Sequence, residues 1–230
     1  MDAAINYLIQ DSGNAIKAID INRALLDSNG FTAETYTGIT DARITLRQKE
    51  TAQNNAVTFY KERTNAQNAE VSKAQDLIRR VRDAARGAYG KDKTKLEPFK
   101  VNDRMPESVK KLCSHCDYLS GIAEEHKTDL LSNGLIEEDL ENLKTASINI
   151  DTADTTQENA RKLQKSATIE RDQAAKVLED KIYKFRKFIK ARFSKRPEIS
   201  VQFEPIPKGR GGGSTEEEKP PENPTEPQKQ

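Results

Sequence analysis

The sequence predicts an all-α fold, namely an elongated antiparallel helical bundle made of two tandem helical hairpins with a disordered C-terminal tail. Hydrophobic residues make up only 34% of the 230 residues and charged residues 33%, which suits long helices with narrow apolar stripes better than a thick core. Two long stretches, 33–89 and 136–193, contain no proline. The third observation is that the chain repeats itself.

The repeat emerges when the sequence is compared with itself 104 residues farther on, where TAQNNA at 51–56 meets TTQENA at 155–160. The turns match too, because LLDSNG at 25–30 corresponds to LLSNG at 130–134. Matching turns are more than shared helical composition provides. We therefore predict an internal duplication, with a first copy at 1–103, a second copy at 104–208 and a tail at 209–230.

Each copy is expected to form a short helix, a tight turn, a long helix and an extended exit. In the first copy, apolar residues at helical spacing predict a helix over 2–27. Asn29 and Gly30 end it because both tolerate the left-handed conformation. Thr32 is the expected N-cap of a second helix over 33–89, which Gly90 stops.

In the second copy, the third helix is expected to start near Pro106, a favoured first-turn residue, and to end at Gly134. A fourth helix then covers 136–193, and Pro197 prevents its continuation. The exit segments KLEPFKV and ISVQFEPIP carry prolines and β-branched residues. We expect them to be extended arms docked on the helices, with a short edge pairing as the alternative.

The short helices cover about half of each long helix. Either the second and fourth helices pair beyond the bundle as a coiled coil, or a second molecule covers them, or the long helices break in the middle. We expect the second and fourth helices to run parallel to each other.

A polar phrase interrupts both apolar stripes. Residues 47–56 and 151–160 hold no apolar side chain larger than alanine, and Gln53 and Gln157 fall where core residues belong. With Asn55 and Asn159, these glutamines are expected to form a polar layer that fixes the helix register. A solvated waist with a kink, and a ligand or ion site, are the alternatives.

The sequence supports no catalytic, cofactor or metal site. The segment CSHC at 113–116 combines both cysteines with a histidine, but on a helix Cys113 and Cys116 share a face that His115 does not. His126 is nearly three turns away. We expect both cysteines to be small core residues, and no enzyme motif is present, so no cofactor is expected.

Two basic clusters lie at the C-terminal ends of the long helices, and parallel long helices would bring them to one end. They are candidates for binding an anionic partner, and they comprise Arg79, Arg80, Arg82 and Arg86 in the first copy and Lys181, Lys184, Arg186, Lys187, Lys190 and Arg192 in the second. The alternative is that the cations complement helix dipoles while interleaved aromatic residues form core. An acidic protein, the chain's own tail, nucleic acid and an anionic membrane surface are the possible partners.

Overall charge and targeting signals add little. The formal net charge is +1, so no global field favours nucleic acid or membranes. No stretch has the ~20 apolar residues of a membrane span, and the N-terminus does not resemble a secretory signal. We expect a cytoplasmic protein. The tail is rich in glycine, proline and glutamate and is expected to be disordered.

The segment YGKD at 89–92 follows a basic long helix and precedes a short exit segment. This junction resembles uncharacterised bacterial long-helix proteins that end a helix in a similar aromatic-Gly-x-Asp turn. The resemblance covers only this junction, and the second copy has Phe193-Ser194-Lys195-Arg196 there instead. It implies a helical fold and no activity.

The expected function is therefore that of a non-enzymatic structural or adaptor protein, which binds protein partners or itself through its long helical faces. Binding of nucleic acid or an anionic membrane surface through a basic end is the alternative.

Overall fold

The computed structural model describes residues 2–207, and within this range the chain is helical and contains no strand. The predicted all-α class with long helices is confirmed. The predicted tail at 209–230 lies outside the described residues. No helix between residues 2 and 207 combines the length and the apolar character needed to cross a membrane.

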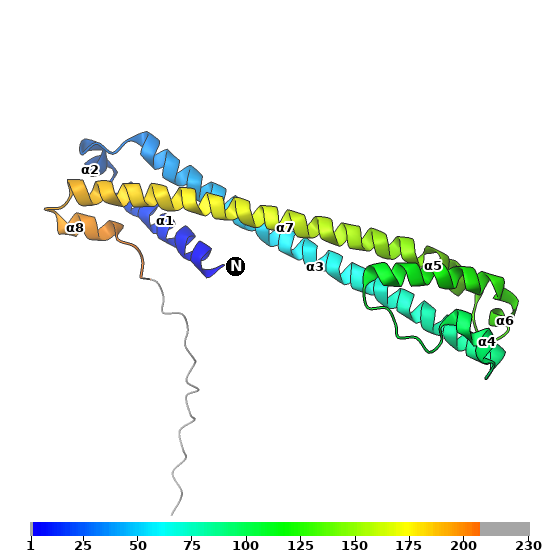
Figure 1. Ribbon diagram of the computed structural model, residues 1–230. Coiled ribbons are helices and arrows are strands. Elements are labelled where there is room, and N and C mark those ends of the chain that lie inside the picture. Colours follow the sequence, from blue (N-terminus) through cyan, green and yellow to red (C-terminus); the bar gives the residue numbers. More distant parts are fainter. Residues whose placement is uncertain (1, 208–230) are drawn as a thin grey trace, which may run out of the picture. The chain divides into compact units, whose positions relative to one another are not determined.

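The elements recur along the chain at an offset of 104 residues (Figure 1). In chain order the first half has α1 (Ala3–Ile21), α2 (Arg23–Ser28), α3 (Ala33–Tyr89), α4 (Lys93–Leu96) and the 3₁₀ helix η1 (Glu97–Phe99). The second half has α5 (Val109–Glu125), α6 (Lys127–Leu131), α7 (Glu137–Arg192), α8 (Pro197–Ser200) and η2 (Val201–Phe203). From α2 and α6 onward, each element begins 104 residues after its counterpart. We call two residues separated by this offset equivalent.

Both long helices are continuous through the polar phrases at 47–56 and 151–160, so a break there is excluded. Their ends match the local chemistry. Thr32 Oγ1 accepts the backbone N–H of Thr35 at 3.2 Å at the start of α3, and Gly90 ends α3 with a φ of 57°. The glycines of the tight turns, Gly30 and Gly134, also have positive φ.

The prediction of uninterrupted short helices was wrong. The first helix is divided at Asn22, between α1 and α2, and the third is divided at the equivalent His126, between α5 and α6. Pro106 is not in the first turn of the third helix, because α5 begins at Val109 with Ser108 as its N-cap. A side chain that hydrogen-bonds the free N–H of Lys111 therefore sets this boundary, rather than proline.

The exit segments dock as expected but are not extended. Asp92 accepts the N–H groups of Thr94 and Lys95 and starts α4, and α8 begins with Pro197 at its first turn. These short helices place Phe99 and Phe203, which are equivalent residues, in buried positions. The local capping groups outweigh the extended preference of the prolines.

The described chain divides into two compact units, each made from both copies. Unit 1 comprises residues 41–179, and unit 2 comprises residues 2–40 and 180–207. Each unit thus combines the start of one copy with the end of the other, so the compact units cut across the sequence repeats at 1–103 and 104–208.

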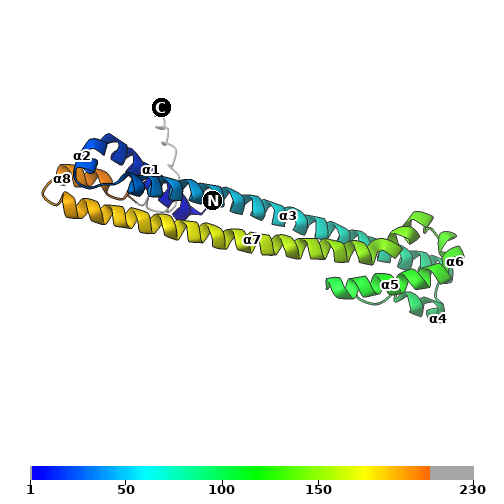
Figure 2. The ribbon, with the colours of Figure 1, turned by 90° about the horizontal axis from the view of Figure 1, so that it is seen from above.

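In unit 1, α3 and α7 lie side by side and run antiparallel (Figure 2). Lys49 on α3 pairs with Glu170 on α7, whereas Arg80 farther along α3 pairs with Asp139 near the start of α7. The prediction that these helices run parallel was wrong. The connection at 90–108 runs back along α3, so that α5 is parallel to α3, as the contacts Arg82–His115 and Tyr89–His126 indicate.

The core of unit 1 forms where α5 packs against α3 and α7. Its fully buried side chains include Ile78 and Val81 of α3, Leu119 of α5 and Ile150 of α7. In unit 2, aromatic rings fill the same role: Phe185 of α7 packs edge-on against Phe31 and Phe203, with ring centroids 5.5 and 5.4 Å apart. Apolar burial at these centres provides most of the stabilisation of each unit.

Candidate functional site

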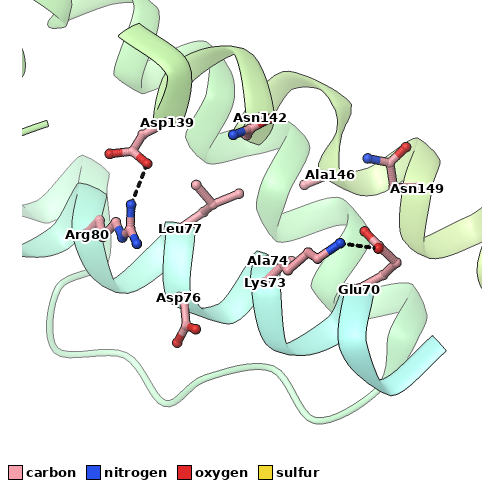
Figure 3. Close-up of a pocket in the computed structure, with 10 residues that line it drawn as sticks. All are labelled: Glu70, Lys73, Ala74, Asp76, Leu77, Arg80, Asp139, Asn142, Ala146 and Asn149. Carbon is pink, nitrogen blue, oxygen red and sulfur yellow. Dashed lines mark hydrogen bonds and ion pairs between the residues drawn. The ribbon is translucent and has the colours of Figure 1, made fainter. Parts of the chain in front are cut away.

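A groove runs between α3 and α7 in unit 1, and no residue of α5 lines it (Figure 3). It consists of two adjoining hollows of about 360 and 400 Å³ that share Glu70, Lys73 and Asn149. The lining is mostly small or polar, and it includes Ala66, Ala74, Leu77, Ala146, Ala153, Asn142, Thr152 and Thr156. A shallow floor of alanines lets another backbone approach the helix pair closely.

The rim of the groove carries paired charges. Lys73 bonds to Glu70 on the same helix at 2.6 Å, and Arg80 bonds across the groove to Asp139 at 2.8 Å. Asn142 and Asn149 are exposed on α7, seven residues apart, and add neutral amide groups to the rim. A polar rim around a less polar floor is the usual composition of a protein-binding surface.

The basic candidates in the first copy are used inside unit 1. Arg79 pairs with Asp76, and Arg86 pairs with Asp83 and donates to the carbonyl of Val101 at 2.6 Å. Arg82 is buried and donates to the carbonyl of Asp103 at 3.0 Å. Together with the Arg80 pair, these contacts engage all four basic candidates of the first copy within unit 1, and their binding of an anionic partner stays a prediction.

The basic candidates in the second copy differ in how far contacts within the protein engage them. Arg186 is held internally by Asp11, with Nη1 and Nη2 each donating to one carboxylate oxygen at 2.8 Å, and its Nε donates to the carbonyl of Phe203. Lys184 pairs with Asp180 at the surface. Lys187 lies over the Tyr183 ring at 5.2 Å. The two clusters belong to different units. The expectation that they share one end depended on parallel long helices, and α3 and α7 run antiparallel.

In each unit a buried or half-buried arginine of a long helix bonds to a side chain of a short helix, and the two contacts join equivalent positions. Arg82 and Arg186 are equivalent, and they face the equivalent residues His115 and Asp11. The Arg82 Nη2 to His115 Nε2 distance is 3.1 Å. Because arginine only donates, the His115 Nε2 must accept, so the imidazole is neutral. Burial, followed by Arg82 and Lys100, lowers the pKa of His115 from its usual 6.5.

The polar layer exists in part. Gln157 of α7 is half-buried and donates to the Tyr60 hydroxyl of α3 at 3.2 Å and to Thr64 Oγ1 at 3.5 Å. Gln53 is half-buried. Asn55 and Asn159 are exposed and do not belong to a buried layer, because residues two positions apart do not share one helix face.

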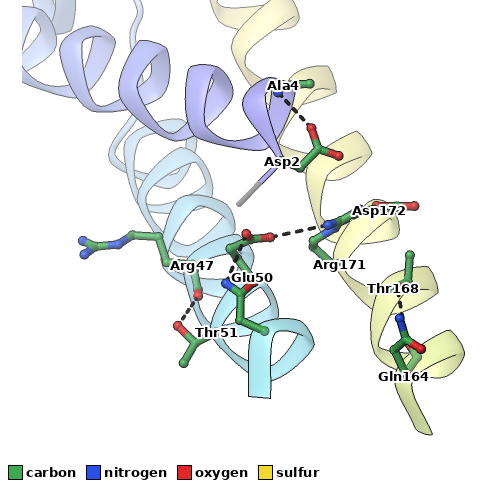
Figure 4. A network of polar contacts seen from close by, with 10 residues as sticks. Asp2, Ala4, Arg47, Glu50, Thr51, Gln164, Thr168, Arg171 and Asp172 are labelled. Carbon is green, nitrogen blue, oxygen red and sulfur yellow. Dashed lines mark hydrogen bonds and ion pairs between the residues drawn. The ribbon is translucent and has the colours of Figure 1, made fainter. Parts of the chain in front are cut away.

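Sequence reasoning missed a second pair of cross-helix contacts between equivalent positions. Glu50 of α3 meets Arg171 of α7 at 3.7 Å, and both side chains are buried (Figure 4). At the equivalent positions Gln67 of α3 donates to Asp154 of α7. The repeat could have indicated these contacts, because Glu50 is equivalent to Asp154 and Gln67 to Arg171. Each contact joins a carboxylate to a long side chain that donates hydrogen bonds. These contacts make the antiparallel register specific.

We expect the Gln157→Ala substitution to lower the free energy of unfolding by about 1 kcal/mol, the usual net value of a lost hydrogen bond. Urea denaturation followed by circular dichroism measures it. Asn159→Ala, two residues away and exposed, is the matched control and is expected to change stability by less than about 0.5 kcal/mol. Equal effects of the two substitutions would contradict a register role for Gln157.

The cysteines are held as protonated thiols. Cys116 is fully buried, and burial raises its pKa to about 12. Cys113 is half-buried and donates weakly to the Ser147 carbonyl at 3.6 Å, and burial also raises its pKa. His115 faces Arg82 rather than the thiols. Residues 2–207 contain no group of three or more His, Cys, Asp or Glu side chains that could hold a metal ion.

The last cluster in unit 1 joins Tyr89 to the α5–α6 break. The Tyr89 hydroxyl donates to Asp129 at 2.8 Å and lies 2.9 Å from His126 Nδ1. Burial and the hydrogen bond to Asp129 raise the pKa of Tyr89 to about 12. The phenol is therefore neutral, and its hydrogen bonds connect the end of α3 to the break between α5 and α6.

No protein family matches the chain, no curated protein matches its sequence, and no solved structure matches its fold.

Proposed function

We propose that this protein is a non-enzymatic adaptor that binds a helical segment of a partner protein in the groove between α3 and α7. The observation that carries the proposal is the open groove of unit 1, with its alanine floor and its rim of paired charges and amides. A helix is the occupant that fits a valley between two helices.

Helix α5 indicates which sequence such a partner presents. It packs on the same two helices through Leu112, Cys116, Leu119 and Ala123, a small and apolar stripe at helical spacing. Leu77 and Ala146 belong to the core that α5 covers, and they also line the groove. A partner helix in the groove would contact these two residues. We therefore expect a partner helix with small and apolar residues on one face and polar flanks that pair with Lys73, Arg80 and Asn149.

The Asn149→Trp substitution tests this proposal, because residue 149 lines both hollows and an indole would fill the groove. Asn159→Trp places the same ring on an exposed part of α7 outside the groove and serves as the control. Affinity capture from a lysate of the source organism, at low and moderate salt, compares the wild type with both variants. We expect one protein that the wild type and the control retain and that Asn149→Trp loses at least tenfold.

The purified partner must then slow amide hydrogen exchange in residues 63–80 and 139–156. Retention of the same proteins by Asn149→Trp would contradict the proposal, as would protection confined to other segments. Sedimentation of the protein alone identifies the remaining possibility, since a dimer that Asn149→Trp dissociates would make a second copy the occupant.

A further inference from the structure

The last turns of α7 carry an exposed basic surface in unit 2, which we define by Lys184, Lys187, Lys190, Arg192 and Lys195. Residues 181–196 contain eight lysines and arginines and no acidic residue. Arg186 is occupied by Asp11, and Arg196 by Glu198. Within residues 2–207, Lys187, Lys190, Arg192 and Lys195 form no ion pair. Apart from Lys184, which pairs with Asp180, the surface is therefore a cluster of cations without an ion-pair partner in residues 2–207.

The equivalent positions in the first copy show that the architecture does not require these cations. They are Arg80, Asp83, Arg86, Ala88 and Lys91, so that Asp83 stands in place of Lys187 and Ala88 in place of Arg192. Asp83 also neutralises Arg86. Helix α3 ends normally with these residues, so complementing the helix dipole does not account for the extra charges on α7.

The basic surface has little of the apolar component that membrane insertion or a protein contact uses. Among the apolar residues of this stretch, Ile182, Phe185, Ile189 and Phe193 are at most 3% exposed, and Phe188 is half-buried against the ring of Phe31. Tyr183 is the one large exposed ring of the stretch, at 60%, and Lys187 lies 5.2 Å from its centroid. An amphipathic helix binds a bilayer through its apolar face, and that face is already used here.

Beside the basic surface lies a cleft of about 390 Å³ between α7 and the α8–η2 segment, lined by Lys190, Ser194, Ser200, Arg186 and Glu204 among others. Cations and hydroxyl groups are the side chains that contact phosphate oxygens. The single acid, Glu204, belongs to the η2 side of the cleft, so an anion would lie on the α7 side, near Lys190 and Ser194.

We propose that the basic surface of α7 binds the phosphate backbone of nucleic acid without sequence preference. Backbone binding needs clustered cations and hydroxyls but no apolar contact, and this is the composition of the surface. The proposal is independent of the groove in unit 1.

The test is fluorescence anisotropy of labelled 20-base-pair DNA and RNA duplexes with the full chain, over a series of salt concentrations. The double variant Lys187→Asp/Arg192→Ala replaces two cations of the basic surface with the residues at the equivalent positions of α3, Asp83 and Ala88. Helix α3 forms with these residues, so the fold should accept them in α7. Its control, Lys162→Ala/Lys176→Asp, alters two exposed lysines of α7 in unit 1 and changes the formal charge equally.

We expect wild-type affinity to fall with salt with a logarithmic slope of about −4, as for four to five phosphate contacts. The basic-surface variant should bind at least tenfold more weakly and lose about 2 from the slope. The charge-matched control should stay within about twofold of the wild type, and Asn149→Trp should bind nucleic acid normally.

Absence of binding at about 50 mM salt would overturn the proposal, and so would equal losses in the two charge variants. Vesicles containing phosphatidylserine are measured in parallel. Binding to them in the absence of duplex binding would assign the surface to lipid headgroups instead. Circular dichroism of each variant confirms that the helical fold is retained.

Discussion

Replacing Asp11 with alanine is expected to destabilise unit 2 by about 3–5 kcal/mol, because it leaves the Arg186 guanidinium without its charge partner. The Asp11 side chain is 4% exposed and accepts two N–H groups of Arg186 at 2.8 Å. The same carboxylate accepts the backbone N–H of Ile206 at 3.0 Å. One substitution therefore removes the ion pair between α1 and α7 and one of the two hydrogen bonds that hold Ile206, the other being donated by the Tyr7 hydroxyl.

Two further variants separate this effect from a general loss of charge. Asp27→Ala breaks the exposed pair with Arg23 in the same unit and is expected to cost no more than about 1 kcal/mol. Asp11→His writes in the residue of the equivalent position 115, whose neutral ring accepts one arginine N–H. It should recover part of the stability that alanine loses.

Urea denaturation at pH 7 gives the unfolding free energies, and thermolysin digestion reports the release of residues 199–206. The interpretation fails if Asp11→Ala remains within about 1 kcal/mol of the wild type, since the bridge would then be no stronger than a surface pair.

The sequence was a good guide to elements that local chemistry determines. Helix α3 covers the predicted range 33–89, because the long proline-free stretch ends at Gly90, which takes the positive φ that a helix stop needs. Direction was harder to predict. The connection at 90–108 is long enough to run back along α3. The packing of Phe99 and Val101 into the core, with hydrogen bonds from Arg82 and Arg86 to its carbonyls, fixes that path.

The candidate sites likewise divide into features that the local sequence shows and features that only tertiary contacts determine. Eight cations at 181–196 are visible in the sequence, but the distinction between Arg186 and Lys187 is not. It depends on Asp11, which lies 175 residues earlier and meets Arg186 only in the folded chain. The groove has no sequence motif, because its floor consists of alanines that serve equally well as core residues.

Acidification is expected to weaken unit 1 through His115. The His115 side chain accepts a hydrogen bond from Arg82, and Arg82 and Lys100 both oppose a positive charge on its ring, with Asp103 acting in the other sense. Burial contributes most to the lowered pKa. Protonation would replace the acceptor with a cation facing Arg82.

The direction of the pH effect follows from linkage. The pKa of His115 is lower in the folded chain than its usual 6.5, so the unfolded chain binds the proton first as the pH falls. The contribution of His115 is fully present above about pH 6.5 and is lost below it, toward the folded pKa. One proton limits the slope to about 1.4 kcal/mol per pH unit.

His115→Asp tests the origin of this response, because it copies the Arg186–Asp11 pair into unit 1. It also offers a carboxylate to Arg82, whose Nε has no hydrogen-bond partner among the described residues. We expect the variant to be at least as stable as the wild type at pH 7 and to lose the slope between pH 5 and 7. Urea titrations across this range provide the measurement.

His126→Asn is the control, since asparagine occupies the equivalent position 22 in unit 2, at the break between α1 and α2. It removes the other histidine and should leave the response to acid in place. A slope that disappears in His126→Asn and persists in His115→Asp would move the acid sensitivity to the Tyr89–His126–Asp129 cluster. The opposite result would assign the acid sensitivity of unit 1 to the contact between His115 and Arg82.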